Sequence, residues 1–379
     1  MLSATYQQEM NREYENYIGI MPCDGVYGRN TNKAYIKALQ AEMGMNVDTA
    51  TGNIGSATRR CLPSIPYQGI EKDYNGRVYT GAKIQQFKKM FNFGLYANSF
   101  GDGIFVGDIN VSAVRQFQNA YGLTITGTVN LETWLSILIS SGDNTRKGTA
   151  CDTRFEITDT NLEILKANGY RIVGRYLTGG SFKEIREGEF QRIFNGGLSV
   201  FPIYQTDGAR ASYFNAEQGA KDALAAEQAA RQKGVPRGTI IYFAVDFDAL
   251  DYNIDESILP HFAALFSTIS GYRVGIYAPR NVCSRVADAG YSVSSFVSDM
   301  STGFSGNLGF PLPKNWAFDQ ISNIYISHNG NSLEIDNNIS SGRDQGFNKL
   351  AGYADPDEDY SPAPTVMPPE QTQTHKIKQ

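Results

Sequence analysis

Apolar and polar positions in the first 140 residues follow the period of amphipathic helices. One predicted helix places its apolar residues on a single face, which is the spacing of a buried stripe: Ala113, Val114, Phe117 and Tyr121. Gly122 follows at the position where a helix commonly ends. An Asp-Gly turn precedes this helix, and a Thr-Gly turn and a shorter helix follow it. The pattern predicts a small all-α unit.

The same landmarks occur earlier in the chain, so the pattern is an internal repeat. The pair Asp24-Gly25 aligns with Asp102-Gly103, and Leu39-Gln40 aligns with Phe117-Gln118, at a shift of 78 residues. After a slip of three residues, Thr51-Gly52 aligns with Thr126-Gly127. We therefore predict two helical units, residues 1–64 and 65–140.

The pattern changes at residue 150, where short apolar runs rich in β-branched residues begin to alternate with helical segments. This alternation predicts a parallel sheet with crossover helices. The clearest runs are residues 171–176, 198–204, 239–247, 272–278 and 295–300. Three further runs, TACD, NWAFDQ and SLEIDNN, bring the number to eight, which is the number for a (β/α)8 TIM barrel. Because the later helices are short, we expect an irregular barrel.

Two polar stretches bound the predicted barrel, which we assign to residues 150–350. Residues 141–149, SGDNTRKGT, are predicted to be a linker. Residues 351–379 are rich in proline and have no periodic apolar pattern, so a disordered tail is expected. Helix-like segments at 211–234 and 255–270 lie between the predicted strands.

Composition and charge exclude several classes of function. The chain has 379 residues, is 41% hydrophobic and has a formal net charge of -5, so it offers no basic field for nucleic acid. It has no apolar run long enough to span a membrane. The N-terminus lacks the basic and apolar segments of a conventional signal peptide, so we expect an extracellular or cell-wall location reached by lysis or unconventional export. A monomer is the default.

Cysteine and histidine spacing gives no metal or cofactor motif. The four cysteines form no CxxC pair: Cys23, Cys61, Cys151 and Cys283. Cys23 and Cys61 could form a disulfide bond within one repeat or remain free thiols. The histidines, at 261, 328 and 375, lack the spacing of metal ligands. We expect neither a metal nor a cofactor.

Polar residues close nearly every predicted strand, and in a TIM barrel these strand ends form the active site. The candidates at these ends are Asp152, Arg175, Tyr176, Gln205, Asp246, Asp248, Tyr277, Arg280, Asp299, Gln320 and Asp336. A single aspartate at such a position usually caps the following helix. A ring of aspartates converging on one pocket is harder to explain by capping alone. The two arginines could clamp a substrate carboxylate or pair with the aspartates.

The sharpest candidate is the carboxylate pair Asp246 and Asp248, which follows the apolar run IIYFAV. Residues i and i+2 of a strand face the same side, so both carboxylates would enter one pocket. Two close carboxylates in an apolar setting repel, which leaves one protonated and one ionised. Glycosidic bond cleavage needs this division. A cation site or a capping pair are the alternatives.

Two family resemblances add to this interpretation. The motif AVRQFQNAYGL...TGTVNLETW resembles the peptidoglycan-binding domain 1 family, and the segments IIYFAVDFD, YRVGIYAPRNVC and LEIDNN resemble the glycoside-hydrolase-like domain of unknown function 1906. The latter is related in fold to the family 25 muramidases. That relation implies Asp248 as proton donor, where the muramidases have glutamate. It also implies Asp246 as its catalytic partner, with Asp152 and Asp336 beside them.

Together these features predict a hydrolase that cleaves the glycan strands of peptidoglycan and is held at its substrate by the repeats. The alternative is a binding protein whose degenerate barrel holds cell-wall glycan without cleaving it.

Overall fold

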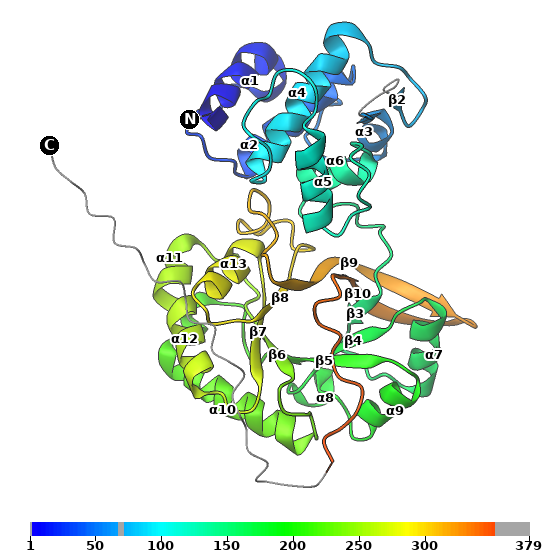
Figure 1. The fold of residues 1–379 in the computed structure, drawn as a ribbon, viewed down its shortest axis with the longest axis vertical. Coiled ribbons are helices and arrows are strands. Elements are labelled where there is room, and N and C mark those ends of the chain that lie inside the picture. Colours follow the sequence, from blue (N-terminus) through cyan, green and yellow to red (C-terminus); the bar gives the residue numbers. More distant parts are fainter. Residues whose placement is uncertain (1, 67–71, 353–379) are drawn as a thin grey trace, which may run out of the picture.

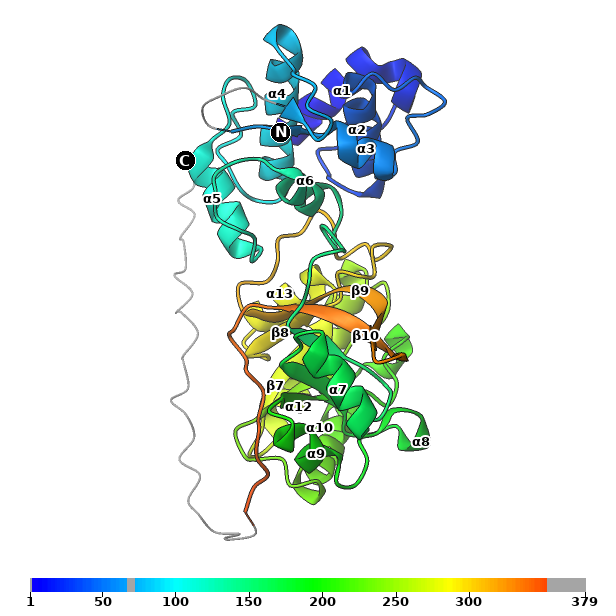
Figure 2. The ribbon, with the colours of Figure 1, turned by 90° about the vertical axis from the view of Figure 1, so that its right-hand side faces the viewer.

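The computed structural model describes residues 2–66 and 72–352. A helical N-terminal part lies at one end of the long axis and a barrel at the other (Figures 1 and 2). Most of the tail predicted to be disordered, from residue 353 onward, lies outside the described residues.

The described portion of the N-terminal part contains six helices: α1 (Leu2–Ile18), α2 (Arg29–Glu42), α3 (Ser56–Cys61), α4 (Gly81–Ala97), α5 (Val111–Ala120) and α6 (Leu131–Leu138). It also contains a two-stranded antiparallel sheet of β1 (Pro63–Ser64) and β2 (Lys72–Asp73). The expectation of a purely α-helical part is therefore wrong in this detail. The two strands are very short, and two residues are too few to produce an alternating pattern in the sequence.

The internal repeat is visible in matching hydrogen bonds around one buried glutamine in each copy. Gln40, in α2, donates to Asn53 O and Thr58 Oγ1 and accepts from Gly52 N. Its counterpart, in α5, makes the equivalent three bonds: Gln118 donates to Thr128 O and Thr133 Oγ1 and accepts from Gly127 N. The glutamines are 78 residues apart and their partners 75, so the slip seen in the sequence is a three-residue difference in the turn.

Eight strands close the barrel: β3 (Ala150–Asp152), β4 (Ile172–Tyr176), β5 (Ser199–Tyr204), β6 (Ile240–Ala244), β7 (Arg273–Ala278), β8 (Ser294–Val297), β9 (Trp316–His328) and β10 (Asn331–Ser340). Their order around the barrel is β10-β3-β4-β5-β6-β7-β8-β9. The predicted number of strands and their order along the chain are confirmed.

The last strand departs from the expected all-parallel sheet. Strands β3 to β9 pair in parallel, but β10 is antiparallel to both β9 and β3. The reason is a tight turn at Asn329-Gly330, where both residues have positive φ (49° and 76°) and which leaves no room for a crossover helix. The barrel therefore closes with a long hairpin (Figure 1).

Helical segments pack around the barrel strands: α7 (Asp159–Ala167), α8 (Gly180–Lys183), α9 (Glu189–Asn195), the 3-10 helix Ala211–Tyr213, α10 (Ala216–Gln232), α11 (Asp251–Asn253), the π-helix Ile254–Ile258, α12 (Leu259–Thr268) and α13 (Arg280–Asp288). The helix expected from residue 211 begins later, because the Asn215 side chain caps α10 by accepting from Gln218 N at 2.8 Å.

Alternation along the strands divides the barrel core in two. Residues on one side of the strands pack against the helices. Residues on the other side fill the barrel interior: Ala150, Ile172, Phe201, Ile203, Ile240, Tyr242, Phe296, Ala317 and Phe318. The Phe201 and Phe318 rings stack there at 4.2 Å. Since this interior is filled by side chains, a ligand can enter only at an end of the barrel.

The predicted linker lies against the barrel. Asn337, in β10, donates to Arg146 O at 2.9 Å and accepts from Gly148 N at 3.0 Å. The apolar core of the helical part also continues into the barrel through Val297, Leu312 and Trp316. The two parts are thus joined by a packed interface.

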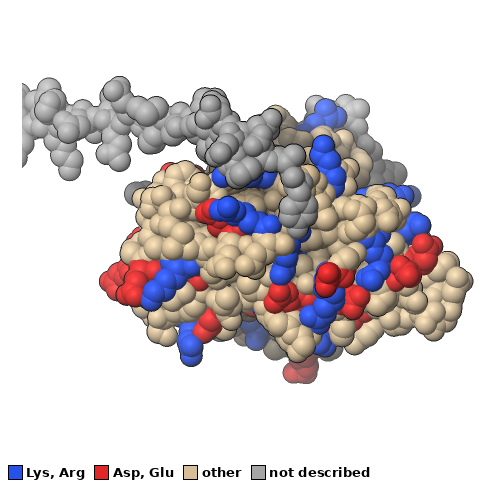
Figure 3. All heavy atoms as spheres, turned by 90° about the horizontal axis from the view of Figure 1, so that it is seen from below, with Lys and Arg blue, Asp and Glu red and all other residues tan. Residues whose placement is uncertain are grey.

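Charged residues of both signs are interspersed on the face at the barrel end of the molecule (Figure 3). Within residues 2–66 and 72–352, no helix combines the length and apolarity needed to cross a bilayer.

Candidate active site

Three aspartates gather at the end of the barrel where the parallel strands terminate. Asp152 ends β3 and lies directly opposite Asp336 of β10. Opposite residues of an antiparallel pair present their side chains on the same face, about 5 Å apart at Cβ. Asp246, two residues beyond the end of β6, interacts electrostatically with both. The structure therefore brings together three of the five aspartates that sequence reasoning singled out for catalysis or substrate contact.

Asp152 is the deepest of the three, with 2% of its surface exposed. Its Oδ1 accepts from Gln320 Nε2 at 2.9 Å and Asn338 Nδ2 at 3.0 Å. Burial, reinforced by the negative charge of Asp336, raises the pKa of Asp152 well above its usual range. Asp152 is thus a buried, hydrogen-bonded carboxyl group whose surroundings favour the protonated form.

Asp246 and Asp336 are only partly buried, so a ligand can reach them. Burial raises the pKa of both carboxyl groups. Hydrogen bonds oppose this shift of the pKa at both groups, from Gln205 at Asp246 and from Asn323 at Asp336. The charged neighbours differ: Lys183 lowers the pKa of Asp246, whereas Glu334 and Asp246 raise the pKa of Asp336. The charged neighbours therefore favour the ionised form more at Asp246 than at Asp336.

Polar and aromatic side chains complete the ring around these carboxyl groups. Tyr277 donates to Gln320 Oε1 at 2.7 Å, and Lys183 donates to Gln205 Oε1 at 2.9 Å. The Lys183 ammonium also lies 4.5 Å from the centre of the Tyr176 ring. The structure places Tyr176, Gln205, Tyr277 and Gln320 at the barrel mouth, and their predicted contact with substrate stays a prediction.

A cavity of about 190 Å³ opens beside Asp336. Its walls come from the segments after β3 and β4, from the end of β5 and from the β9–β10 hairpin: Thr153, Arg154, Phe155, Tyr176, Phe182, Lys183, Gln205, Asn323, Glu334, Ile335 and Asp336. Aromatic rings beside carboxyl and amide groups are the combination that binds sugars, because the rings cover the C–H faces and the polar groups bond the hydroxyls.

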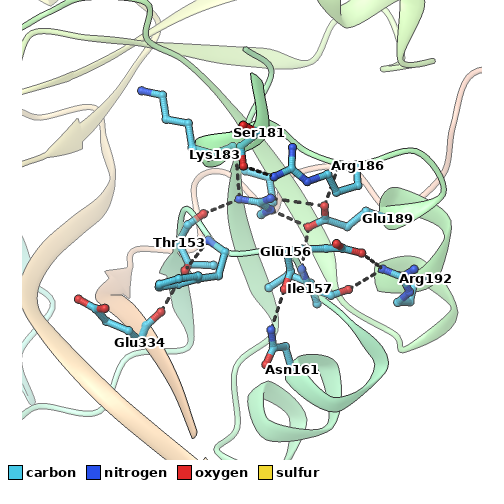
Figure 4. A network of polar contacts seen from close by, with 12 residues as sticks. Thr153, Glu156, Ile157, Asn161, Ser181, Lys183, Arg186, Glu189, Arg192 and Glu334 are labelled. Atoms are coloured by element: carbon cyan, nitrogen blue, oxygen red, sulfur yellow. Dashed lines mark hydrogen bonds and ion pairs between the residues drawn. The ribbon is translucent and has the colours of Figure 1, made fainter. Parts of the chain in front are cut away.

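Arg175 is not in this cavity. It faces the helices and forms a completely buried ion pair with Glu189, at 2.7 Å. Its guanidinium also donates to Thr153 O at 2.5 Å and to Lys183 O at 3.3 Å. Figure 4 shows Thr153, Lys183 and Glu189 converging from separate segments, with the Lys183 side chain pointing away from this network. Arg175 thus holds the two segments that form the cavity walls.

Arg280 and Asp299 also lie elsewhere, at the interface with the helical part. The Arg280 guanidinium bonds both Asp299 carboxylate oxygens, at 2.7–3.0 Å. It also donates to Ser140 O at 2.8 Å and to Tyr121 OH at 3.2 Å, both in the helical part. Sequence reasoning left open whether the arginines bind ligand or pair with acidic residues, and the structure shows pairing for both.

Asp248 does not share a pocket with Asp246. Its carboxylate accepts a hydrogen bond from Ser305 N at 2.6 Å. It also accepts one at 2.9 Å from Nη2 of Arg29, which belongs to the first repeat. The expected geometry fails because β6 ends at Ala244, so the alternation of a strand does not extend to these residues. Asp248 connects the barrel to the helical part.

Sequence reasoning missed several residues of the site, among them Lys183, Asn323 and Asn338, which contact its polar groups. Asn338 lies two positions after Asp336 on β10, so strand alternation could have placed it on the same face. Asn323 pairs with Asp336 in the hairpin and donates to its Oδ1 at 2.9 Å. Lys183 lies at the end of α8, and no local pattern marks it.

Within the described ranges, no group of three or more His, Cys, Asp and Glu side chains is arranged to hold a metal ion. All four cysteines are free, including Cys23 and Cys61. Burial raises the pKa of Cys151 and Cys283, which suppresses the reactive thiolate.

Comparison with known proteins finds two matching family models. Residues 163–340 match the Rv2525c-like, glycoside hydrolase-like domain. Residues 4–138 match the FadG/YbfG, PGDB-like domain. The predicted glycoside hydrolase-like barrel is confirmed. Neither description names a peptidoglycan-binding domain 1 module or a family 25 muramidase, so those two relations stay predictions.

Two proteins of Bacillus subtilis (strain 168) resemble nearly the whole chain. Uncharacterized protein FadG is 45% identical over 91% of this chain, and uncharacterized protein YbfG is 44% identical over 92%. The match covers 60% of FadG and 49% of YbfG, so the chain spans about half the length of these relatives.

Solved structures resemble about half of the chain at low identity. The Mycobacterium tuberculosis Tat-secreted protein Rv2525c is 19% identical, with a TM-score of 0.44 over 52% of this chain and 98% of that chain. An uncharacterized B. stearothermophilus protein is 20% identical, with a TM-score of 0.40 over 51% of this chain and 96% of that chain.

Proposed function

We propose that this protein is a glycoside hydrolase that cleaves the glycan strands of peptidoglycan, with Asp336 as the proton donor and Asp246 as the ionised partner. The observation that carries the proposal is a pair of partly exposed carboxyl groups at the barrel mouth whose charged neighbours differ, a cation beside Asp246 and carboxylates beside Asp336. Glycosidic cleavage uses such a pair on the two sides of one bond.

Each carboxyl group has one task in this mechanism. Asp336 gives its proton to the glycosidic oxygen as the bond to the anomeric carbon breaks. Asp246 stabilises the positive charge that develops on the sugar and accepts a proton from the water molecule that replaces the leaving group at the anomeric carbon. Asp152, held neutral by burial, limits the negative charge beside Asp336. The family resemblance implied Asp248 as the proton donor. The proposal assigns this function to Asp336 instead, because the Asp248 carboxylate is bonded to Arg29 and Ser305.

The choice of peptidoglycan is supported by the repeated helical part, which is fixed to the barrel and resembles modules attached to cell-wall hydrolases. Tethering of this kind raises the effective concentration of a polymeric substrate at the barrel. Because peptidoglycan lies outside the membrane, we also propose that the protein acts at the cell wall.

Release of reducing ends from purified peptidoglycan tests the proposal. The wild-type protein should release them, and Asp246→Asn and Asp336→Asn should each lower the rate by at least about a hundredfold, as expected for loss of an acid or base group. Asp248→Asn is the matched variant and should retain most of the activity.

Activity that disappears in Asp248→Asn but persists in Asp246→Asn would refute the assignment of the two carboxyl groups. Tight binding of glycan without any turnover would instead favour a non-catalytic binding protein. The shortness of the aspartate side chains around the mouth, where many glycosidases use glutamate, is the observation that favours this second function.

A further inference from the structure

We propose that the outer wall of the barrel-mouth cavity holds a subsite for a sugar that carries a carboxylate, with the Arg154 guanidinium as the anion-binding group. Arg154, Phe155 and Phe182 line the same cavity as Asp336. The inference rests on the proposed function for the idea that glycan enters this cavity, and it adds the chemical class of the sugar.

The Arg154 guanidinium lies against two aromatic rings. Its Cζ lies 4.1 Å from the centre of the Phe155 ring and 5.0 Å from that of Phe182. Stacking occupies the faces of the planar guanidinium and leaves its N–H edges free. Those edges match the two oxygens of a carboxylate. Because the rings restrict the side chain in advance, less conformational entropy is lost when an anion binds.

No acidic side chain of the described residues forms an ion pair with Arg154, although Glu334 lines the same cavity. The Glu334 carboxylate instead accepts from Tyr325 OH at 3.3 Å. The Phe182 ring beside Arg154 is 64% exposed, which leaves apolar surface next to an unpaired cation. A pyranose ring against Phe182, with its carboxylate on Arg154, would cover both.

The distribution of charge fixes the direction of such a sugar. Asp336 lines the inner side of the cavity and interacts electrostatically with Asp246, so this side is acidic. The nearby Lys183 is already engaged with Gln205 and the Tyr176 ring. A ligand carboxylate is repelled from this inner side and attracted to Arg154 at the rim. The bond to be cleaved then lies at the aspartates, and the charged substituent points outward.

Binding of three tetrasaccharides tests the subsite. One is the peptide-free peptidoglycan repeat, whose muramic sugars carry a lactyl carboxylate. The second is an oligogalacturonate with ring carboxylates, and the third is neutral chitotetraose. Dissociation constants are measured by calorimetry on the full chain in the Asp246→Asn background, which keeps the ligands intact. Arg154→Gln and Arg154→Lys are compared with the parent, and thermal unfolding checks that each variant is folded.

Arg154→Gln should weaken binding of an acidic tetrasaccharide about tenfold or more, the loss expected for hydrogen bonds between charged groups. The affinity for chitotetraose should be unchanged. For an acidic tetrasaccharide, the affinity of Arg154→Lys should lie between those of the parent and Arg154→Gln, because lysine keeps the charge without the planar guanidinium. Whichever acidic tetrasaccharide depends on Arg154 identifies the source of the carboxylate.

Equal weakening for the neutral and acidic ligands, no weakening for either acidic ligand, or no binding of any of the three would overturn the subsite. Failure of the proposed function is distinguishable from these results. Arg154-dependent binding together with an absence of cleavage by the wild-type protein would refute hydrolysis and leave the subsite standing.

Discussion

Replacing Arg280 with methionine should strongly destabilise the protein, because this arginine joins the barrel to the helical part. Methionine retains much of the side-chain volume and removes the charge. The exposed fractions of the Arg280 and Asp299 side chains are 1% and 0%, so neither is screened by solvent. The change leaves the Asp299 carboxylate buried without its cation and removes the donors to Ser140 O and Phe310 O.

The expected loss is about 3–5 kcal/mol in the free energy of unfolding, the range for breaking one side of a buried ion pair. The matched control is Lys221→Met, which breaks an exposed pair with Glu217 and should cost less than about 1 kcal/mol. The double variant Arg280→Met/Asp299→Asn should be less destabilised than the sum of the two single variants, because it removes the buried charge as well.

Urea unfolding followed by tryptophan fluorescence measures these losses, since Trp134 and Trp316 lie in the core that the two parts share. A loss for Arg280→Met no larger than that for Lys221→Met would refute the reasoning that this ion pair is a buried structural link.

Two further predictions follow from other contacts. Lys183→Met should move the acidic limb of the pH–activity profile to higher pH, because Lys183 lowers the pKa of Asp246 and without it Asp246 ionises only at higher pH. The control variant Lys233→Met removes an ion pair with Glu184 and should leave the profile in place. An unshifted profile for Lys183→Met would contradict the assignment of Asp246. Gln40→Ala and Gln118→Ala should each lower the free energy of unfolding by about 1–3 kcal/mol, because each leaves equivalent buried groups of its own repeat without a hydrogen-bond partner. Urea unfolding measures both losses, and destabilisation of only one variant would contradict the equivalence of the repeats.

Period and spacing were sufficient to predict much of the fold. The repeat could be found because Gln40 and Gln118 are each followed by a Gly and a Thr partner in the same order, at distances along the chain that differ by three residues. The barrel strands could be found because their interior and exterior faces are both apolar, which produces runs such as IIYFA. Strand direction could not be found this way, because a run in an antiparallel β10 looks the same as one in a parallel strand.

The site was only partly predictable for a related reason. A strand-end residue faces either the cavity or the surrounding helices, and a shift of one position decides which. Tyr176 and Arg175 are neighbours, yet one lines the cavity and the other is buried with Glu189. The partners of Arg280 and Asp248 come from the helical part, far away in the sequence, and no local pattern identifies them.

Hydrolysis of peptidoglycan in water enriched in oxygen-18 tests the central claim most directly. The account predicts glycan fragments whose new reducing-end sugars carry one heavy oxygen, produced by the wild-type protein and not by Asp246→Asn or Asp336→Asn. Intact glycan strands after prolonged incubation, or fragments that form equally with both variants, would contradict it.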